Sequence, residues 1–219
     1  LSAAEDAFVR PSPTRGHLGG VNLQTNEAML LCESAGYDVV FIETVGVGQS
    51  EVAIADVADI VILVVPPGSG DSLQGIKKGV MEISDLIVVN KCDGSLKTAA
   101  MRAKSHIKSA LEVTRGKYDN WRTKVLLCSA LEKNNIPMIW EEINNFKETQ
   151  GMEDVIKEHR QEQGKKIMWN YLQFQMMQKL KDTFQEELSN AEGRVLDAEI
   201  TPSYAAEMIC EKIFPKKQQ

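Results

Sequence analysis

Short apolar runs alternate with helix-like segments along the first two-thirds of the chain. The apolar runs are rich in β-branched residues and do not alternate in polarity: 38–43, 59–65, 85–90 and 124–128. Such runs are typical of strands that are covered on both faces of a parallel sheet. The helix-like segments between them are 49–57, 71–82, 95–115 and 135–148. This alternation predicts an α/β fold, with a mostly parallel sheet and flanking helices.

The N-terminal sequence predicts a loop followed by a helix. Residues 1–24 read as a loop, because Pro11 and Pro13 restrict the backbone at and before their own positions. Thr25 is a plausible N-cap for the helix that follows, and Gly36 is a natural stop for it.

The composition changes at residue 150, where a helical arm is predicted to begin. From Met152 to Ser189 there is no strand-like run and no proline, and Pro202 opens a last short helix. Large apolar residues recur in this arm at spacings of three and four: Trp169, Leu172, Met176, Leu180, Phe184 and Leu188. Such a stripe is typical of a packing face, within a domain or between subunits. We therefore expect one domain over 1–150 and a C-terminal helical arm over 151–219.

Chemistry-bearing residues follow the predicted strands at their carboxyl ends. The strands end at Glu43, at Pro66-Pro67, at Asn90 and at Ser129. Ligands of parallel sheets bind beyond these ends, at one edge of the sheet. The pattern thus predicts that all the candidate motifs lie at a common edge.

Asn90-Lys91-Cys92-Asp93 has the residue types that read a guanine base. Asp93 can accept hydrogen bonds from guanine N1 and from its 2-amino group, which adenine cannot offer in that pattern. Asn90 can reach the base edge and tie neighbouring loops together, and the stem of Lys91 can lie over the base plane. A polar loop without function is the alternative. The position at a strand end, followed by a fourth strand and Ser129-Ala130-Leu131, favours the guanine site, with backbone N–H groups of 129–131 donating to O6.

Glu43 is a candidate for orienting the attacking water, directly or through Mg²⁺, at a γ-phosphate. In this interpretation the Gly46 N–H senses the γ-phosphate, and the loop through Gln49 moves when that phosphate leaves. The alternative is a surface carboxylate at a strand end. The segment is not itself a phosphate cradle of the form G-x-x-x-x-G-K-[ST], because Glu43 replaces the first glycine and Gln49 replaces the lysine.

Asp71, Gln74 and Lys77 are candidates for reading the nucleotide state. They are three residues apart, roughly on one face of a predicted helix that follows the loop 66–70. Asp71 also has a local explanation as the N-cap of that helix.

Composition and charge exclude several other classes of function. The chain has 219 residues and a net charge of −6, which argues against nucleic-acid binding. Its four cysteines form no C-x-x-C pair, and its three histidines have no convergent partners at metal-ligand spacing. No apolar run approaches the ~18 residues of a membrane span.

Together these motifs resemble those of the MeaB/ArgK group of P-loop GTPases, whose eukaryotic members are the methylmalonic aciduria type A proteins. The resemblance covers the whole chain. The segments that carry it are 10–16 (Arg-Pro-Ser-Pro-Thr-Arg-Gly), 18–21, 25–27, 43–51, 71–77 and 168–170.

The resemblance implies a GTPase that acts as a chaperone for adenosylcobalamin-dependent methylmalonyl-CoA mutase, with GTP, GDP and Mg²⁺ as ligands. It implies that the mutase, a cobalamin adenosyltransferase and a second copy of the chain are partners. The net charge and the absence of a membrane-length apolar run lead us to expect no nucleic-acid or membrane partner. The resemblance places the protein in the mitochondrial matrix of a eukaryote or the cytoplasm of a bacterium. By resemblance, Glu43 is the switch II acid. Asn90, Lys91 and Asp93 form the guanine-specificity motif, and 71–77 form switch III.

The sequence departs from the family pattern in two places. The N-terminal helical part, the first strand and the P-loop of the family have no counterpart here, and Ala4 stands where the family tends to carry an aspartate near the metal. We therefore expect a fragment that binds GTP poorly or not at all. One rival interpretation is a non-enzymatic binding or dimerisation module. Another is a related P-loop metallochaperone for nickel enzymes, which the absence of a His/Cys cluster disfavours.

Overall fold

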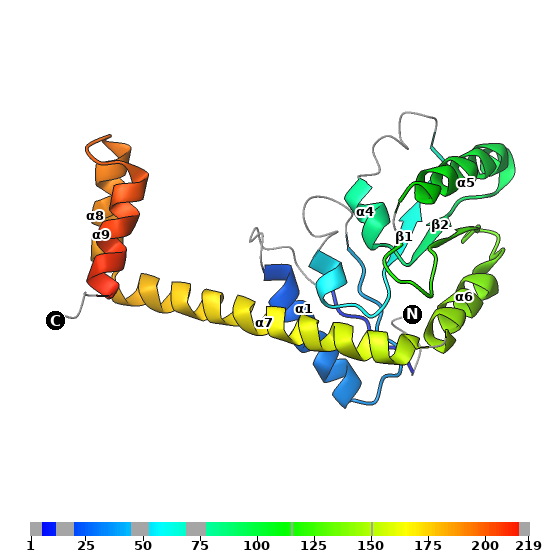
Figure 1. Cartoon of the computed structure of the whole chain (residues 1–219), viewed down its shortest axis with the longest axis horizontal. Helices are drawn as coiled ribbons and strands as arrows, with labels where there is room; N and C mark the ends of the chain where they lie inside the picture. The colour runs from blue at the N-terminus through cyan, green and yellow to red at the C-terminus, as the bar shows by residue number, and fades with distance from the viewer. Residues whose placement is uncertain are drawn as a thin grey trace. The chain divides into compact units, whose positions relative to one another are not determined.

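The computed structural model describes 6–11, 20–44, 53–68, 78–114, 116–149 and 151–214. Its sheet has strands β1 (Ile62–Val65), β2 (Leu86–Val89) and β3 (Lys124–Leu127), all parallel and in the order β1-β2-β3. The register pairs Val64 with Val88 and Val88 with Leu126. The structure confirms the predicted α/β fold with a small parallel sheet and flanking helices (Figure 1).

The sheet is covered on both faces, which explains its apolar sequence. Helix α5 (Lys97–Glu112) packs one face through Ala100, Ala103 and Ile107, against Ile87, Val89 and Val125 among others. Helix α6 (Ile136–Glu148) places Ile139 and Ile143 against the other face. Every residue of β2 is buried, as expected for the central strand of a covered parallel sheet.

The predicted strand over 38–43 is wrong. Residues 39–44 are irregular, and Phe41 is 79% exposed. A strand is stabilised by its ladder of hydrogen bonds, and none of the described residues pairs with this segment. Its β-branched composition therefore does not make it a strand here, and Glu43 lies in an irregular segment.

Helix α1 spans Gly20–Ser34, so its predicted start at Thr25 is also wrong. Thr25 lies inside the helix. The predicted stop is confirmed, because Gly36 adopts φ +90°. Its N–H bonds the Glu33 carbonyl at 3.0 Å, and the Tyr37 N–H bonds the Cys32 carbonyl at 3.1 Å. These two bonds form a Schellman motif, which a left-handed glycine terminates.

The other short elements follow the prediction where the structure describes them. The 3₁₀ turn η1 (Ile54–Asp56) and helix α4 (Lys78–Ile83) lie within the two helix-like segments predicted before β1 and β2. A second 3₁₀ turn, η2 (Gly94–Leu96), leads into α5. The remainder of these two segments, 49–52 and 71–77, is outside the described residues.

At the amino ends of the strands, a buried carboxylate links several segments. Asp85 is 1% exposed, and its Oδ2 accepts from the Val61 N–H at 2.7 Å while its Oδ1 lies 3.0 Å from Lys117 Nζ. Trp121 Nε1 donates to the Asp85 carbonyl at 2.9 Å. Burial raises the pKa of Asp85, against the opposing effects of Lys117 and of the Val61 N–H. These bonds satisfy the buried carboxylate and fix the loop before β3 to the start of β2.

The contacts divide the chain into two compact units, Leu1–Ile167 and Met168–Gln219. Helix α7 (Met152–Thr183) runs through the division. In the first unit, buried Met152 packs against Trp121 and Phe146, and Gln163 Nε2 donates to the carbonyls of Ala55 and Ala58 at 3.1 and 3.0 Å. The domain boundary expected after residue 150 remains a prediction.

In the second unit, α8 (Gln185–Leu196) and α9 (Pro202–Ile213) contact each other. Lys212 Nζ lies 2.6 Å from Glu187 Oε1, and the Thr201 side chain caps α9 by accepting from the Tyr204 N–H. Helix α9 begins at Pro202, as the sequence predicts.

Candidate functional site

The loops that follow the three strands are held together by backbone bonds at the carboxyl edge of the sheet. The Asn90 N–H bonds the Val65 carbonyl at 2.9 Å, and the Cys128 N–H bonds the Val89 carbonyl at 2.9 Å. Beyond the strands, the Cys92 N–H bonds the Cys128 carbonyl, also at 2.9 Å. Two of the predicted motifs, 90–93 and 129–131, therefore begin side by side, where the hydrogen bonds of the sheet continue past the ends of the strands.

Asn90 connects these two motifs through its side chain. Its Oδ1 accepts from its neighbour's N–H, that of Lys91, at 2.7 Å and from the Ala130 N–H at 3.1 Å. The Cys128 Sγ lies 3.4 Å from the same oxygen. Lys91 reaches this arrangement with φ 58°, in the left-handed region. Its side chain is exposed.

Asp93 is oriented by Ser129. The Ser129 hydroxyl donates to Asp93 Oδ2 at 2.5 Å and accepts from the Glu132 N–H at 3.0 Å. Ser129 is fully buried. The Oδ1 of Asp93 has no hydrogen-bond partner among the described residues, so it is available to accept from a ligand.

The backbone N–H groups of 129–131 are not equivalent. The Ser129 N–H bonds the Asn134 carbonyl at 3.1 Å, and the Ala130 N–H is taken by Asn90. In the described part of the chain, the Leu131 N–H has no partner. Leu131 is also 85% exposed. Of the three N–H groups predicted to meet guanine O6, that of Leu131 is the one left free in this conformation.

No contact among the described residues brings the remaining predicted site residues to the motifs 90–93 and 129–131. Glu43 is exposed and forms no ion pair with a described residue. Gly46, Gln49, Asp71, Gln74 and Lys77 lie outside the described residues.

Sequence reasoning missed two residues that shape the site, Asn134 and Asn135. Asn134 forms a two-way backbone bridge with Ser129, and Asn135, at φ 61°, donates from Nδ2 to the Leu127 carbonyl at 3.0 Å. Burial raises the pKa of the Cys128 thiol, with a smaller effect from Cys92, so it stays a protonated side chain beside Asn90. The pair Asn134-Asn135, which precedes a helix with a proline in its first turn, is a sequence signal for the turn before α6.

The donor set fits a guanine edge better than it fits a metal ion. An open carboxylate oxygen at Asp93 and an open N–H at Leu131 match the donors and the O6 acceptor of guanine. Within the described ranges, no three His, Cys, Asp or Glu side chains converge as metal ligands. Two surface hollows lie elsewhere, and neither is lined by Asn90, Asp93 or Ser129.

Searching the described helices for a membrane span identifies none of sufficient length and apolar character.

Comparison with known proteins identifies a family. Residues 1–185 match the family described as methylmalonyl Co-A mutase-associated GTPase MeaB. The chain is 41% identical over 211 residues to the mouse protein named methylmalonic aciduria type A homolog, mitochondrial, covering 95% of this chain and 51% of the relative. It is 52% identical over 163 residues to the Escherichia coli GTPase ArgK, covering 74% of this chain and 49% of the relative.

A solved structure agrees with this assignment. The crystal structure of LAO/AO transport system kinase matches with a TM-score of 0.72 and 38% identity, over 97% of this chain and 67% of the other. The chain spans about half the length of the curated relatives it matches. From the family match and these relatives, the chain belongs to the MeaB family of methylmalonyl-CoA mutase-associated GTPases.

Proposed function

We propose that this chain carries the guanine-reading and partner-coupling parts of a GTPase that serves methylmalonyl-CoA mutase. The observation that supports the proposal best is the pair of contacts that joins the two predicted base-reading motifs, Asn90 to Ala130 and Asp93 to Ser129. The family's description as mutase-associated GTPases supports the choice of nucleotide and of partner.

In the proposed complex, Asp93 reads the base. Its Oδ1 accepts from guanine N1–H and from the 2-amino group, while Ser129 holds Oδ2. The Leu131 N–H donates to O6, and the Lys91 stem lies along the base plane. A base without these donors leaves a carboxylate unpaired, which gives the discrimination.

Glu43 and the segments 45–50 and 71–77 are proposed to respond to the γ-phosphate. Glu43 orients the attacking water, and the Gly46 N–H contacts the γ-phosphate. Loss of that phosphate releases the loop through Gln49, and Asp71, Gln74 and Lys77 pass the change to the mutase. GTP would be held with Mg²⁺, whose chemistry is to neutralise charge on the phosphate oxygens.

The proposed biological role is that of a chaperone. Nucleotide hydrolysis would gate the loading of adenosylcobalamin into the mutase from a cobalamin adenosyltransferase, and would protect the mutase afterwards. The support for this role is the family match and the relatives named for methylmalonic aciduria type A.

Replacement of the base-reading carboxylate tests the proposal. In Asp93→Asn the amide donates where the carboxylate accepted, so preference should move from GTP towards xanthosine triphosphate by roughly tenfold or more. Calorimetric titration of the chain with each nucleotide and Mg²⁺ gives the two affinities. Asp119→Asn, an exposed change outside the site, is the matched control.

The outcomes separate the proposal from its rivals. An unchanged ratio of affinities in Asp93→Asn contradicts the base-reading role. No binding of either nucleotide by the parent chain favours the second candidate, a non-catalytic interaction module. That candidate is supported by the sequence, in which no G-x-x-x-x-G-K-[ST] motif occurs. The metallochaperone alternative is supported by no ligand cluster in the described residues.

A further inference from the structure

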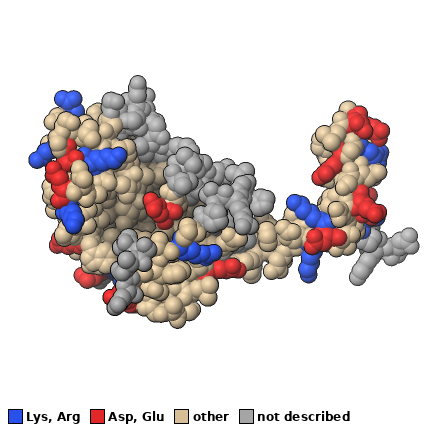
Figure 2. Space-filling model, turned by 180° about the vertical axis from the view of Figure 1, so that it is seen from behind, with Lys and Arg blue, Asp and Glu red and all other residues tan. Residues whose placement is uncertain are grey.

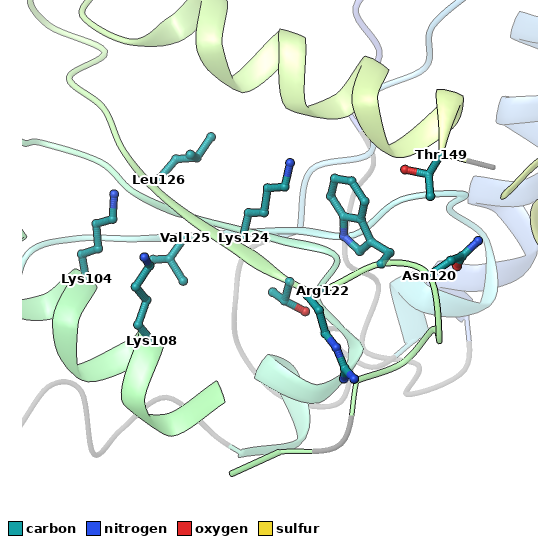
Figure 3. Close-up of a pocket in the computed structure, with 10 residues that line it drawn as sticks. Lys104, Lys108, Asn120, Arg122, Lys124, Val125, Leu126 and Thr149 are labelled. Carbon is teal, nitrogen blue, oxygen red and sulfur yellow. The ribbon is translucent and has the colours of Figure 1, made fainter. Parts of the chain in front are cut away.

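A surface hollow lies beside the start of β3, at the opposite end of that strand from the base-reading motifs. Its volume is about 640 Å³. Seven consecutive residues, 120–126, line it together with Lys104 and Lys108 of α5 and Thr149 (Figure 3). Three of the seven, 124–126, belong to β3, and the other four lie in the segment that leads into it. The hollow, called the groove below, therefore lies beside the start of β3 and the segment before it.

On the outer side of β3 the peptide group of Val125 is open, whereas the Leu127 carbonyl is already bonded by Asn135. Strand β3 is the edge of the described sheet. The Cys128 N–H points to Val89 on β2, so the alternating pattern of a strand turns the peptide groups of Val125 and Leu127 away from β2. Asn135 Nδ2 reaches the Leu127 carbonyl from that outer side, which agrees with this direction. The N–H groups of Val125 and Leu127 have no partner among the residues that the structure describes.

Four basic side chains and no acidic one are among the residues that line the groove. Lys124 is held by Glu142 and lies 4.7 Å from the centre of the Trp121 ring. In the described part of the chain, Lys104, Lys108 and Arg122 have no ion-pair partner. Figure 2 shows basic side chains, with some acidic ones among them, at the side of the molecule that carries α5. Two of these cations come from α5 and one from the segment before β3, in a chain whose net charge is −6.

The unpaired cations lie on one side of the strand. Lys104 and Lys108 are four residues apart on α5, which covers the sheet face that contains Val125. Arg122 lines a second hollow together with Lys108, so it lies on the same side. A strand that added to β3 would point every second side chain to that side.

We propose that the β3 edge binds an extended acidic segment of a partner protein, which adds to the sheet as a further strand. The segment carries Asp or Glu at every second position, facing Lys104, Lys108 and Arg122. Its main chain bonds the outward N–H and carbonyl of Val125 and the outward N–H of Leu127, whose carbonyl is held by Asn135, in the manner of strand addition to an open sheet edge. Charge complementarity and the open peptide groups together distinguish this occupant from a compact anion, which would need donors that converge on one point.

A synthetic peptide tests the proposal with the full chain. The probe is a fluorescein-labelled, end-blocked peptide of roughly eight residues that alternates Thr and Glu. We expect saturable binding by fluorescence anisotropy, with slowed amide hydrogen exchange in 124–128. Two further peptides are N-methylated on one or the other alternate set of amides. One should lose roughly tenfold or more in affinity and the other should not, because only one set faces β3.

Charge variants with a matched control test the site. Lys104→Glu with Lys108→Glu should weaken binding by roughly tenfold or more, since two attractions become repulsions. Lys97→Glu with Arg102→Glu makes the same change in net charge on the same helix but outside the groove, and should change affinity by less than about threefold. Circular dichroism shows whether each variant is folded.

Three results would overturn the proposal. Equal weakening by the two double variants means that only net charge matters. Equal affinity of the two N-methylated peptides, with displacement of the probe by inorganic tripolyphosphate, means that the groove is a polyanion site. Unchanged exchange in 124–128 at saturating peptide means that no strand forms there.

Discussion

At the scale of single residues, the candidate site depends on one hydroxyl. Ser129 is fully buried, donates to Asp93 and accepts from the Glu132 N–H. It therefore orients the base-reading carboxylate and also closes the turn that follows β3. A residue with both tasks should affect stability and nucleotide preference together.

Ser129→Ala should lower the free energy of unfolding by about 1–3 kcal/mol, because the Glu132 N–H and Asp93 lose a buried partner. Urea denaturation measures the change. Ser109→Ala, at an exposed position of α5, is the control and should stay within about 0.5 kcal/mol. Equal stability of Ser129→Ala and the parent chain would mean that the hydroxyl has no structural role.

His159 gives the first unit a dependence on pH. Burial lowers the pKa of His159, as does Lys117, while Asp85 and Asp59 oppose them and Lys166 adds a small lowering effect. The folded protein thus favours the neutral imidazole. The stability this provides is complete above the unfolded-state pKa near 6.5, and declines as pH falls through that value until the folded state is also protonated.

The parent chain should therefore lose more stability than His159→Gln between pH 7.5 and about 5. Urea midpoints across that range measure the difference. His106→Gln, at an exposed position of α5, is the control substitution. If the parent and His159→Gln lost the same stability with falling pH, the imidazole would not be the cause.

At the scale of elements, glycines at a helix end and in a helix interior have opposite effects. Gly36 terminates α1 at φ +90°, where a side chain is strained. Gly164 lies inside α7, where an added Cβ meets no atom within 4 Å. The left-handed position favours glycine, and the helical position favours alanine.

Gly36→Ala should destabilise the protein by about 1 kcal/mol, and Gly164→Ala should stabilise it by about 0.5–1 kcal/mol. Thermal unfolding followed by circular dichroism gives both signs from one experiment. The same sign for both substitutions would contradict the assignment of either backbone position.

The sequence predicts a strand correctly where an apolar run also has a neighbouring strand to pair with. Strand β2 was placed to within a residue, because a fully covered central strand has a continuous apolar run. The segment 38–43 has a similar composition but no pairing strand among the described residues, and pairing is not written in a local pattern. The early start of α1 was missed because a residue that can cap a helix is also tolerated inside one.

The candidate site was predictable in its members but not in its hydrogen bonds. Asn90, Asp93 and Ser129 could be placed together, since parallel strands end at one edge. That Asn90 occupies the Ala130 N–H, leaving Leu131 free, depends on the left-handed turn at Lys91. Such a conformation at a lysine has no signal in the sequence.

At the scale of the whole molecule, the apolar stripe of the arm predicts self-association. In the second unit, Trp169, Leu172 and Met176 are all exposed, and they recur on one side of α7 at spacings of three and four. Exposed apolar stripes of this kind mark contact surfaces. The family resemblance makes a second copy of the chain the proposed occupant.

Trp169→Glu with Leu172→Glu should convert a dimer into a monomer, because two charges would be buried without partners. Light scattering coupled to size-exclusion chromatography measures the mass. Gln178→Glu, on the opposite side of the same helix, should leave the mass unchanged. A monomeric parent chain at high concentration would contradict the proposal.

The ladder that continues from β2 and β3 into Cys92 and Cys128 has a thermodynamic consequence. The loops that would meet a purine ring are already ordered when the protein folds, so little chain entropy remains to be lost when a base arrives. The base would then bind without a rearrangement of these loops. Whatever rearrangement accompanies turnover would originate at the phosphate end of the nucleotide.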